Sequence, residues 1–402
     1  MTVFVLGFYL ALKGLKEDKK KLFFLSLPLF LLTYFLYPGY RVFTPLSLLP
    51  FLFLNFKTGK VYFKKKLLFF VVPFFLLSFL ISTTSWGKGR FEQTSLFYNQ
   101  EVKGKIGAVN IAFIFDEGSD QIFEARVFHN KIVGYFKEGT EQYLSYFSPG
   151  FLFVKGGLPD RYLVPGQGLF YLTSLTLLFF LLLPSKKRNL IFYYFLYLLI
   201  IAPIPAALTV DDVPNVHRSA VLILPVLFLA TVGFKGLISL TKNKHFKILI
   251  SFLIVLLIGL EFIYFWHQYS NHTASYKGIY RNGGSEELVS FIKDNEAGFD
   301  QVIMPGLGTL PLYYLFYNSN FNSSLVGRFE EGMVISKAGK AIFINNWCPS
   351  RETDLDQLEG KTILVNRPDC DIPLGFEEIE IIERKDSTAA FRILGNELFN
   401  LE

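Results

Sequence analysis

Residues 248–266 read ILISFLIVLLIGLEFIYFW, an apolar run whose only charged residue is Glu261. A transmembrane helix needs about 20 predominantly apolar residues, so this run has the length of one membrane crossing. A basic stretch, Lys235 to Lys247, comes immediately before it, and no comparable lysine cluster follows it. Because Lys and Arg are retained in the cytoplasm, the sequence predicts that the chain leaves this helix on the outer face.

The same alternation of apolar segments and basic gaps extends back to the N-terminus. The apolar segments lie near residues 2–13, 22–37, 42–56, 67–82, 168–184, 189–208, 219–240 and 248–266. The strongly basic gaps are Lys13 to Lys21, Lys57 to Lys66, Lys186 to Arg188, and Lys235 to Lys247. The positive-inside rule then places two long hydrophilic regions, 83–167 and 267–402, on the outer face.

We therefore predict a polytopic α-helical membrane protein of about eight transmembrane helices. Helices one to four occupy residues 1–82 and helices five to eight occupy residues 168–266. Between them, 83–167 forms an outer α+β loop domain, and 267–402 forms a C-terminal outer α/β domain. Pro45 and Pro50 fall inside the third helix, and proline is tolerated there when neighbouring helices satisfy the freed carbonyls, so we expect packed helices.

Composition supports a membrane protein and excludes several other classes. Hydrophobic residues make up 51% of the chain and charged residues only 18%, below the roughly 25% of average soluble domains. The net charge of +6 is accounted for by the cytoplasmic loops, so no basic face for nucleic acid is expected. The five histidines show no metal-ligand spacing and no phosphate-binding glycine loop occurs, so we expect no cofactor and no metal.

Two cysteines, Cys348 and Cys370, lie in the C-terminal outer region. An oxidising compartment permits a disulfide there, and two unpaired thiols fit the sequence equally well.

The loop domain is predicted to contain a β-hairpin and a surface helix. Alternating stretches at 107–115 and 121–128 flank a polar turn at 116–120, which favours the hairpin. The following piece, 132–147, has apolar residues at helical spacing, as expected for a helix on the membrane surface or against the hairpin.

The C-terminal domain is predicted to be α/β. Ser285 is the expected N-cap of a helix that ends at Asn295, because acidic residues follow it in the first turn. Strands are expected at 301–304, 341–344 and 362–365, with a final hairpin formed by 378–383 and 389–394.

The first candidate site is the outer loop 209–218, which ends in His217 and Arg218. Pro214 and its polar neighbours are typical of a helix N-terminus, where free N–H groups and a partial positive charge favour anions. Arg218, whose donors match phosphate oxygens, and His217 complete an anion site at lipid headgroup depth. The alternative is that Arg218 reaches the interface as an ordinary snorkelling side chain, with Asp211 and Asp212 as caps.

Arg161 is the second candidate, in the loop Lys155 to Tyr162 ahead of the fifth helix. Gly156 and Gly157 would let the backbone approach a ligand closely. The alternative is a structural loop that anchors the outer domain to the membrane.

No catalytic base can be named from the sequence. Asp116 and Glu117 lie in the predicted hairpin turn, where acidic residues are favoured for backbone reasons. Glu261 is nearly the only ionisable residue within a predicted helix and lies about one turn from its outer end. The apolar helix centres argue against a transporter, which would place ionisable groups near mid-membrane.

Three groups of short runs resemble bacterial membrane glycosyltransferases of the GT-C class, the relatives of protein mannosyltransferases and aminoarabinose transferases. They are Arg41 to Leu46, Tyr143 to Phe153 with Gly156–Arg161 and Pro165–Tyr171, and Pro203 to Leu208 with His217–Arg218 and Leu224–Pro225. The resemblance implies transfer of a sugar from a polyprenyl-phosphate carrier in the bilayer to a glycan, lipid or protein acceptor outside the plasma membrane. It also implies that Arg218, His217 and Arg161 contact the carrier phosphate.

The family's catalytic acids follow its first membrane helix, whereas the first outer loop here, Tyr37 to Arg41, has no carboxylate. Gly157 also stands where relatives often carry Asp. The resemblance therefore implies the C-terminal portion of a larger enzyme, whose N-terminal half is absent or supplied by a second chain. The alternative hypothesis is a non-catalytic scaffold or assembly subunit, or an inactive remnant, in envelope glycan synthesis.

Overall fold

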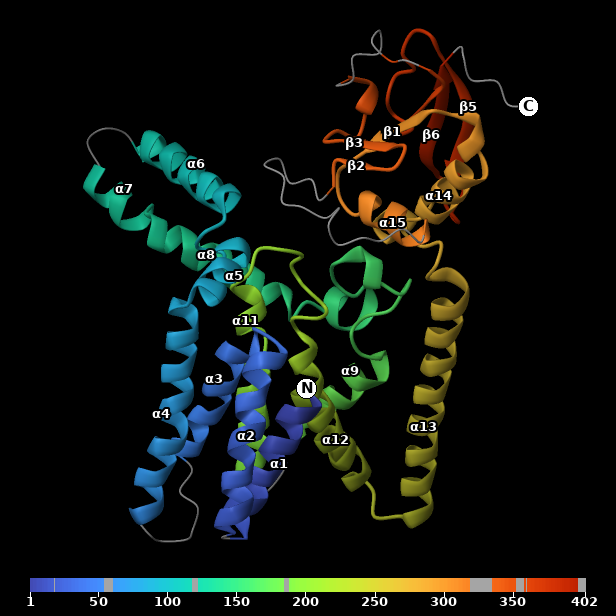
Figure 1. The fold of residues 1–402 in the computed structure, drawn as a ribbon. Coiled ribbons are helices and arrows are strands. Elements are labelled where there is room, and N and C mark those ends of the chain that lie inside the picture. Colours follow the sequence, from blue (N-terminus) through green and yellow to red (C-terminus); the bar gives the residue numbers. More distant parts are fainter. Residues whose placement is uncertain are drawn as a thin grey trace. The chain divides into compact units, whose positions relative to one another are not determined.

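The computed structural model describes residues 1–17, 19–53, 61–117, 122–183, 188–318, 335–351, 358 and 360–396. The chain divides into two compact units, Met1–His267 and Gln268–Glu402. The first is helical and the second is built on a β-sheet (Figure 1). Parts of three sequence predictions, the turn at 118–120 and the basic residues at 57–60 and 186–187, lie outside the described residues.

The α-helices of the first unit differ widely in length. They are α1 (Thr2–Lys16), α2 (Lys20–Leu36), α3 (Tyr40–Phe53), α4 (Val61–Thr83), α5 (Ser85–Thr94), α6 (Gln100–Glu117), α7 (Ile122–Phe128), α8 (Lys131–Ser145), α9 (Leu172–Phe179), α10 (Leu190–Ile201), α11 (Ile204–Ala207), α12 (Ile223–Ser239) and α13 (Lys244–His267).

The prediction of eight transmembrane helices is wrong. Among the described residues, three helical stretches are long and apolar enough to cross a membrane: Leu190–Ala207, Ala220–Ser239 and Lys244–His272. A fourth is added if Val71–Thr83 and Gly87–Thr94, which meet at 82°, are one broken span.

The number of candidate membrane spans is lower than predicted because several of the apolar helices are too short to cross a membrane. Helices α1, α2 and α3 have 15, 17 and 14 residues. At 1.5 Å per residue they extend about 21–26 Å, short of the roughly 30 Å hydrocarbon core. The apolar helix at Leu172–Leu182 is shorter still. Hydropathy alone counted these short packed helices as crossings.

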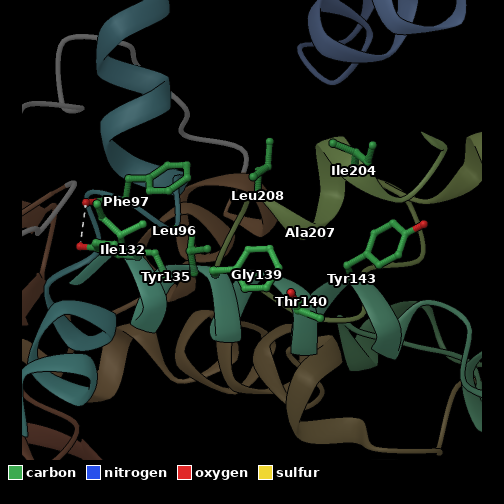
Figure 2. A pocket seen from close by; sticks show the side chains of 11 residues that line it. Leu96, Phe97, Ile132, Tyr135, Gly139, Thr140, Tyr143, Ile204, Ala207 and Leu208 are labelled. Carbon is green, nitrogen blue, oxygen red and sulfur yellow. Dashed lines mark hydrogen bonds between the residues drawn. The ribbon is translucent and has the colours of Figure 1, made fainter. Parts of the chain in front are cut away.

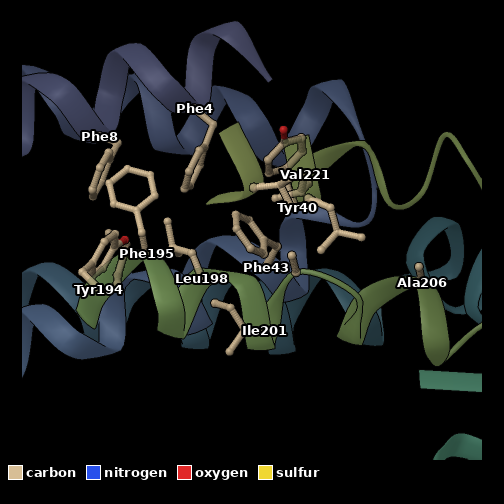
Figure 3. Close-up of a cluster of buried hydrophobic side chains, with 14 of the residues drawn as sticks. Phe4, Phe8, Tyr40, Phe43, Tyr194, Phe195, Leu198, Ile201, Ala206 and Val221 are labelled. Carbon is tan, nitrogen blue, oxygen red and sulfur yellow. The ribbon is translucent and has the colours of Figure 1, made fainter. Parts of the chain in front are cut away.

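Aromatic side chains form the centre of the helical core, where α1, α3 and α10 meet (Figure 3). Phe8 stacks on Tyr194 with ring centroids 4.9 Å apart, and Phe4 lies 5.1 Å from Phe43. The Tyr194 hydroxyl donates to the carbonyl of Ser47 at 2.8 Å. Helix α10 is therefore joined to α3 by a buried hydrogen bond as well as by apolar contact.

The two prolines of α3 confirm the prediction of packed helices. A proline frees the carbonyl four residues earlier, which here is Arg41 for Pro45 and Leu46 for Pro50. Ser78 of α4 donates to the Arg41 carbonyl at 2.6 Å, and Tyr197 of α10 donates to the Leu46 carbonyl at 2.8 Å. Neighbouring helices thus satisfy both freed acceptors, as backbone groups in an apolar environment require.

The predicted β-hairpin of the loop domain is also wrong, because both of its stretches are helical. Helix α6 covers 107–115 and α7 covers most of 121–128. Small and apolar residues fill nearly every side of α6, so its alternation does not distinguish a strand from a helix. A helix start is also present, since Asn99 accepts the backbone N–H of Val102 at 2.9 Å.

The amphipathic segment predicted at 132–147 is confirmed as a helix, α8. Asn130 caps its start by accepting the backbone N–H groups of Ile132 and Val133 at 2.9 and 3.0 Å.

The C-terminal unit has a six-stranded mixed sheet in the order β2-β3-β1-β4-β6-β5. Its strands are β1 (Gln301–Pro305), β2 (Lys337–Ala338), β3 (Ala341–Ile344), β4 (Thr362–Asn366), β5 (Phe376–Glu383) and β6 (Ala389–Asn396). Strand β1 is parallel to β3 and β4, whereas β6 is antiparallel to β4 and β5. These strands confirm the predicted positions of the central strands and of the final hairpin.

Alternation along the strands gives the sheet two buried faces. Val302 and Met304 of β1 pack on the face that contacts α14 (Ser285–Asp294) and α15 (Leu310–Tyr317), while Ile303 packs on the opposite face. Ser285 is the first residue of α14 rather than its N-cap, which is Gly284 at φ 89°. The positive φ favours glycine at that position.

One disulfide and one acidic strand complete the unit. Cys348 and Cys370 form a disulfide between the segments that follow β3 and β4. A disulfide fits an extracytoplasmic location, since cytosolic thiols are kept reduced. The last strand of the sheet, β5, carries four exposed glutamates, Glu377, Glu378, Glu380 and Glu383.

Candidate functional site

The two loops predicted as candidate sites lie side by side and share backbone hydrogen bonds. The N–H of Leu158 donates to the carbonyl of Pro214 at 2.8 Å, and the N–H of Val216 donates to the carbonyl of Leu158 at 3.0 Å. We call these segments, 155–163 and 209–218, the loop pair. Residues well separated in sequence therefore belong to one structural element.

Pro214 does not begin a helix, contrary to the sequence prediction. The chain turns through the loop pair and enters a short 3-10 helix at Ala220–Leu222, and α12 starts only at Ile223. The buried side chain of Asn215 organises this turn by accepting the N–H of Arg218 at 2.9 Å. The free N–H groups expected to bind an anion at 214 are therefore not arranged as a helix N-terminus.

The glycines of the first loop are needed for its contact with the second. A Cβ on Gly157 would collide with the carbonyl oxygen of Pro214 and with the ring of Phe151. Gly156 has φ +70°, in the left-handed region that favours glycine. An aspartate at 157, where the resemblance places one, would have no room in this structure.

Arg218 is held by the loop that contains it. Its Nη1 donates to the Thr209 hydroxyl at 2.6 Å and to the Asp211 carbonyl at 2.8 Å, and its Nη2 lies 3.3 Å from the Asp211 carboxylate. Only 18% of its side chain is exposed. Arg218 thus fixes the shape of 209–218 through three contacts within it.

Arg161 and His217 are exposed, and both contact the ring of Tyr162. The guanidinium of Arg161 lies 5.0 Å from the ring centre of Tyr162, and the ring of His217 meets the same ring edge-on at 4.1 Å. The structure therefore brings two of the three predicted phosphate contacts together at the surface of the loop pair. Tyr162, which orders them, was not singled out from the sequence.

Helix α8 holds the second loop from the side. The hydroxyl of Tyr146, at the C-terminal end of α8, accepts the N–H of Asn215 at 3.1 Å. Burial raises the pKa of Tyr146 to about 12, so this tyrosine stays neutral at physiological pH. Gln142, assigned with its amide nitrogen toward the loop, donates to the carbonyls of Ala207 and Thr209 at 2.9 and 3.1 Å.

An apolar pocket of about 630 Å³ also lies against α8 (Figure 2). One wall is a stripe of α8 residues with helical spacing: Ile132, Tyr135, Phe136, Gly139, Thr140 and Tyr143. The other wall is formed by Leu96, Phe97, Ile204, Ala207 and Leu208. Since Ile204 and Ala207 end the membrane-length stretch Leu190–Ala207, the pocket lies at one end of a candidate membrane span.

The pocket and the loop pair are continuous along the chain. The carbonyl of Leu208 accepts the N–H of Leu96 at 3.0 Å, which closes the pocket wall. The next residue, Thr209, accepts the hydrogen bond from Arg218. An apolar cavity is thus followed directly by a polar loop that carries arginine and histidine.

Among the described residues that line this pocket, neither Asp116 nor Glu261 is present. Asp116 is exposed near the end of α6, and the side chain of Glu117 lies outside the described residues. Glu261 accepts hydrogen bonds from the N–H and hydroxyl of Thr173 at 3.1 and 2.6 Å, so it caps the first turn of α9. The buried carboxylate in the loop pair is Asp160, which the sequence patterns did not single out.

Within the described ranges, no group of three or more His, Cys, Asp or Glu side chains is placed to hold a metal ion. Comparison of the chain with protein-family models, with curated proteins and with solved structures found no match.

Proposed function

We propose that this chain is the membrane and outer-face part of a glycosyltransferase that takes a sugar from a polyprenyl-phosphate carrier. The acceptor would be an extracytoplasmic glycan, lipid or protein. In this proposal the chain crosses the plasma membrane several times, and its loop domain and C-terminal unit face outward. The observation that carries the proposal is that the apolar pocket is followed directly along the chain by the loop pair, which carries Arg161 and His217 at its surface.

The two halves of such a carrier match the two halves of this site. An isoprenoid chain would bury apolar surface against the α8 stripe, gaining about 25 cal/mol for each Å² removed from water. Its phosphate would meet Arg161 and His217, which are exposed and share the Tyr162 ring. Arg218 would act as a positioning residue, because its donors already order the loop on which His217 lies.

The transfer itself breaks one bond and forms another. An acceptor hydroxyl attacks the anomeric carbon, the bond from that carbon to the phosphate oxygen breaks, and the electron pair leaves with the polyprenyl phosphate. The departing phosphate gains negative charge, which cations nearby stabilise. In this proposal the acceptor's proton goes to a carboxylate base that a second chain supplies.

Photocrosslinking in membranes tests the binding half of this proposal. A polyprenyl phosphate with a photoreactive isoprene unit should label the chain, and Gly139→Leu should remove the labelling by filling the pocket. A Cβ on Gly139 meets only Leu96 at 3.5 Å, so the helix itself tolerates the side chain. Gly104→Leu is the matched control, since a Cβ there meets nothing within 4 Å.

The charged half is tested with Arg161→Gln/His217→Gln, compared with Arg126→Gln on the exposed face of α7. Labelling by the phosphate-bearing probe should fall, while labelling by the corresponding uncharged polyprenol should not. Equal labelling of the wild type and of both site variants would overturn the proposal.

A non-catalytic scaffold or assembly subunit is the second candidate function. The observation that favours it is that Arg218 makes three contacts with Thr209 and Asp211 of its own loop, as a structural loop would require. Normal glycan synthesis with Arg161→Gln/His217→Gln, and loss of synthesis only when the chain is deleted, would support this function.

A further inference from the structure

A second cavity, of about 560 Å³, lies between the C-terminal ends of α9 and α12 and the N-terminal end of α10. Its lining comes from Phe180–Leu183 after α9, from the start of α10 and from the last three turns of α12. The glycines of α12 allow this close meeting, because a Cβ on Gly233 would collide with the carbonyl oxygen of Leu177.

The charged side chains of the lining lie near the N-terminal end of α10 and the C-terminal end of α12, and mainly apolar side chains line the rest. The polar side chains are Arg188, Asn189, Thr231, Lys235 and Ser239. The apolar ones include Phe192 of α10 and Phe228 and Val232 of α12, which lie deeper along both helices. A ligand that fills this cavity would therefore have a polar head and an apolar body.

The charge at the polar end is positive. Arg188 and Lys235 line the cavity, and the described lining contains no Asp or Glu. Arg188 is held over the ring of Phe192 at 4.6 Å, and its Nη2 donates to the carbonyls of Leu181 and Leu183. Both of these hydrogen bonds use Nη2, and a guanidinium carries five N–H donors, so donors on Nε and Nη1 remain for a ligand.

We propose that this cavity is a binding site for an anionic phospholipid of the inner leaflet. Its phosphate contacts Arg188 and Lys235, and the upper part of its acyl chains lies along Phe228 and Val232. The positive-inside rule puts this basic end on the cytoplasmic side, and basic pockets between membrane helices on that side bind anionic headgroups. The site is separate from the loop pair and does not depend on the proposed function.

Native mass spectrometry of the full chain, released from phosphatidylcholine nanodiscs that contain 30% phosphatidylglycerol, measures the preference directly. We expect the wild type to retain phosphatidylglycerol over phosphatidylcholine. Each removed cation should lower that preference about fivefold, so Arg188→Gln/Lys235→Gln should lower it roughly 25-fold.

Two further variants separate a site from general surface charge. Lys242→Gln/Lys244→Gln removes two cations from the segment just after α12, outside the cavity lining, and should leave the preference unchanged. Ser239→Trp blocks the polar end without changing charge and should lower retention of phosphatidylglycerol. Circular dichroism at each step checks that the helices remain folded.

Three results would overturn the proposal. The first is an unchanged preference in Arg188→Gln/Lys235→Gln, and the second is an equal loss in the Lys242→Gln/Lys244→Gln control. The third is displacement of phosphatidylglycerol by millimolar inorganic phosphate, which would identify the site as one for a free anion rather than a lipid.

Discussion

Reduction of the Cys348–Cys370 disulfide should destabilise the C-terminal unit while leaving the helical unit unaffected. The bond closes a chain segment with a sequence separation of 22. Loop-closure entropy for that length gives about 3 kcal/mol of stabilisation at 25 °C, through the smaller number of conformations open to the unfolded chain. The disulfide also lies at the centre of the sheet order, because it links the segments after β3 and β4, the two strands on either side of β1.

Amide hydrogen exchange of the full chain in nanodiscs reports this loss. The central strands β1 and β4 should exchange only through unfolding of the whole unit. A loss of about 3 kcal/mol then accelerates their exchange roughly 200-fold after reduction. Peptides from Met1–His267, which contains neither cysteine, provide the internal control.

The Cys348→Ser/Cys370→Ser variant should match the reduced protein without added reductant. If verified reduction changed exchange in β1 and β4 by less than threefold, the entropic reasoning would be refuted. Faster exchange in both units would instead indicate a general effect of the reductant.

Three further predictions concern single residues. Tyr146→Phe leaves a buried backbone N–H without its acceptor and should cost about 1–3 kcal/mol, seen as a lower melting temperature in detergent; an unchanged value would contradict this. Gly157→Ala should lower the melting temperature, because its Cβ collides with the second loop of the loop pair. Gly150→Ala is the control, since a Cβ there meets nothing within 4 Å. Equal melting temperatures for the two variants would contradict the steric explanation. Hydrogen bonds from Thr388, the largest cause, lower the pKa of Asp386 below its ordinary value of 3.8. Its stabilisation is therefore present at neutral pH and lost as the pH falls through the lowered pKa, and Asp386→Asn should flatten the acid dependence of unfolding measured by fluorescence.

The central strands β1, β3 and β4 were predictable because each is short, largely buried and bounded by clear turns. In β4, Thr362 to Asn366 is buried at every position, and such a run can be recognised from its β-branched residues and length. The final hairpin was equally clear, since its two strands flank a turn rich in charged and small residues. In both cases local sequence and tertiary packing favour the same conformation.

The helical unit was less predictable because hydropathy does not report what surrounds a helix. The apolar faces of α1 and α2 pack against other helices, so a short length suffices for them where a membrane crossing would need more. In α6, apolar residues on all sides hid the helical period, and the cap at Asn99 was the signal that could have corrected the hairpin prediction.

The candidate site was predicted as residues but not as an arrangement. The sequence singled out Arg161, His217 and Arg218, yet no spacing shows that Leu158 pairs with Pro214. Nor does it show that Arg218 is held by residues of its own loop, or that α8 supplies both Tyr146 and the pocket wall. Such contacts depend on how the helices pack, which single-sequence patterns do not specify.

The four glutamates of β5 bear on whether the sheet of one copy can pair with the sheet of another. An outermost strand offers unpaired N–H and carbonyl groups to any strand that approaches it. A second copy that added its own β5 would bring two rows of carboxylates together, and like charges directly opposite each other destabilise a strand pair. At the opposite side of the sheet, β2 is only two residues long and offers little to pair with. Edge-to-edge pairing of this sheet between two copies of the chain is therefore disfavoured at both outer strands.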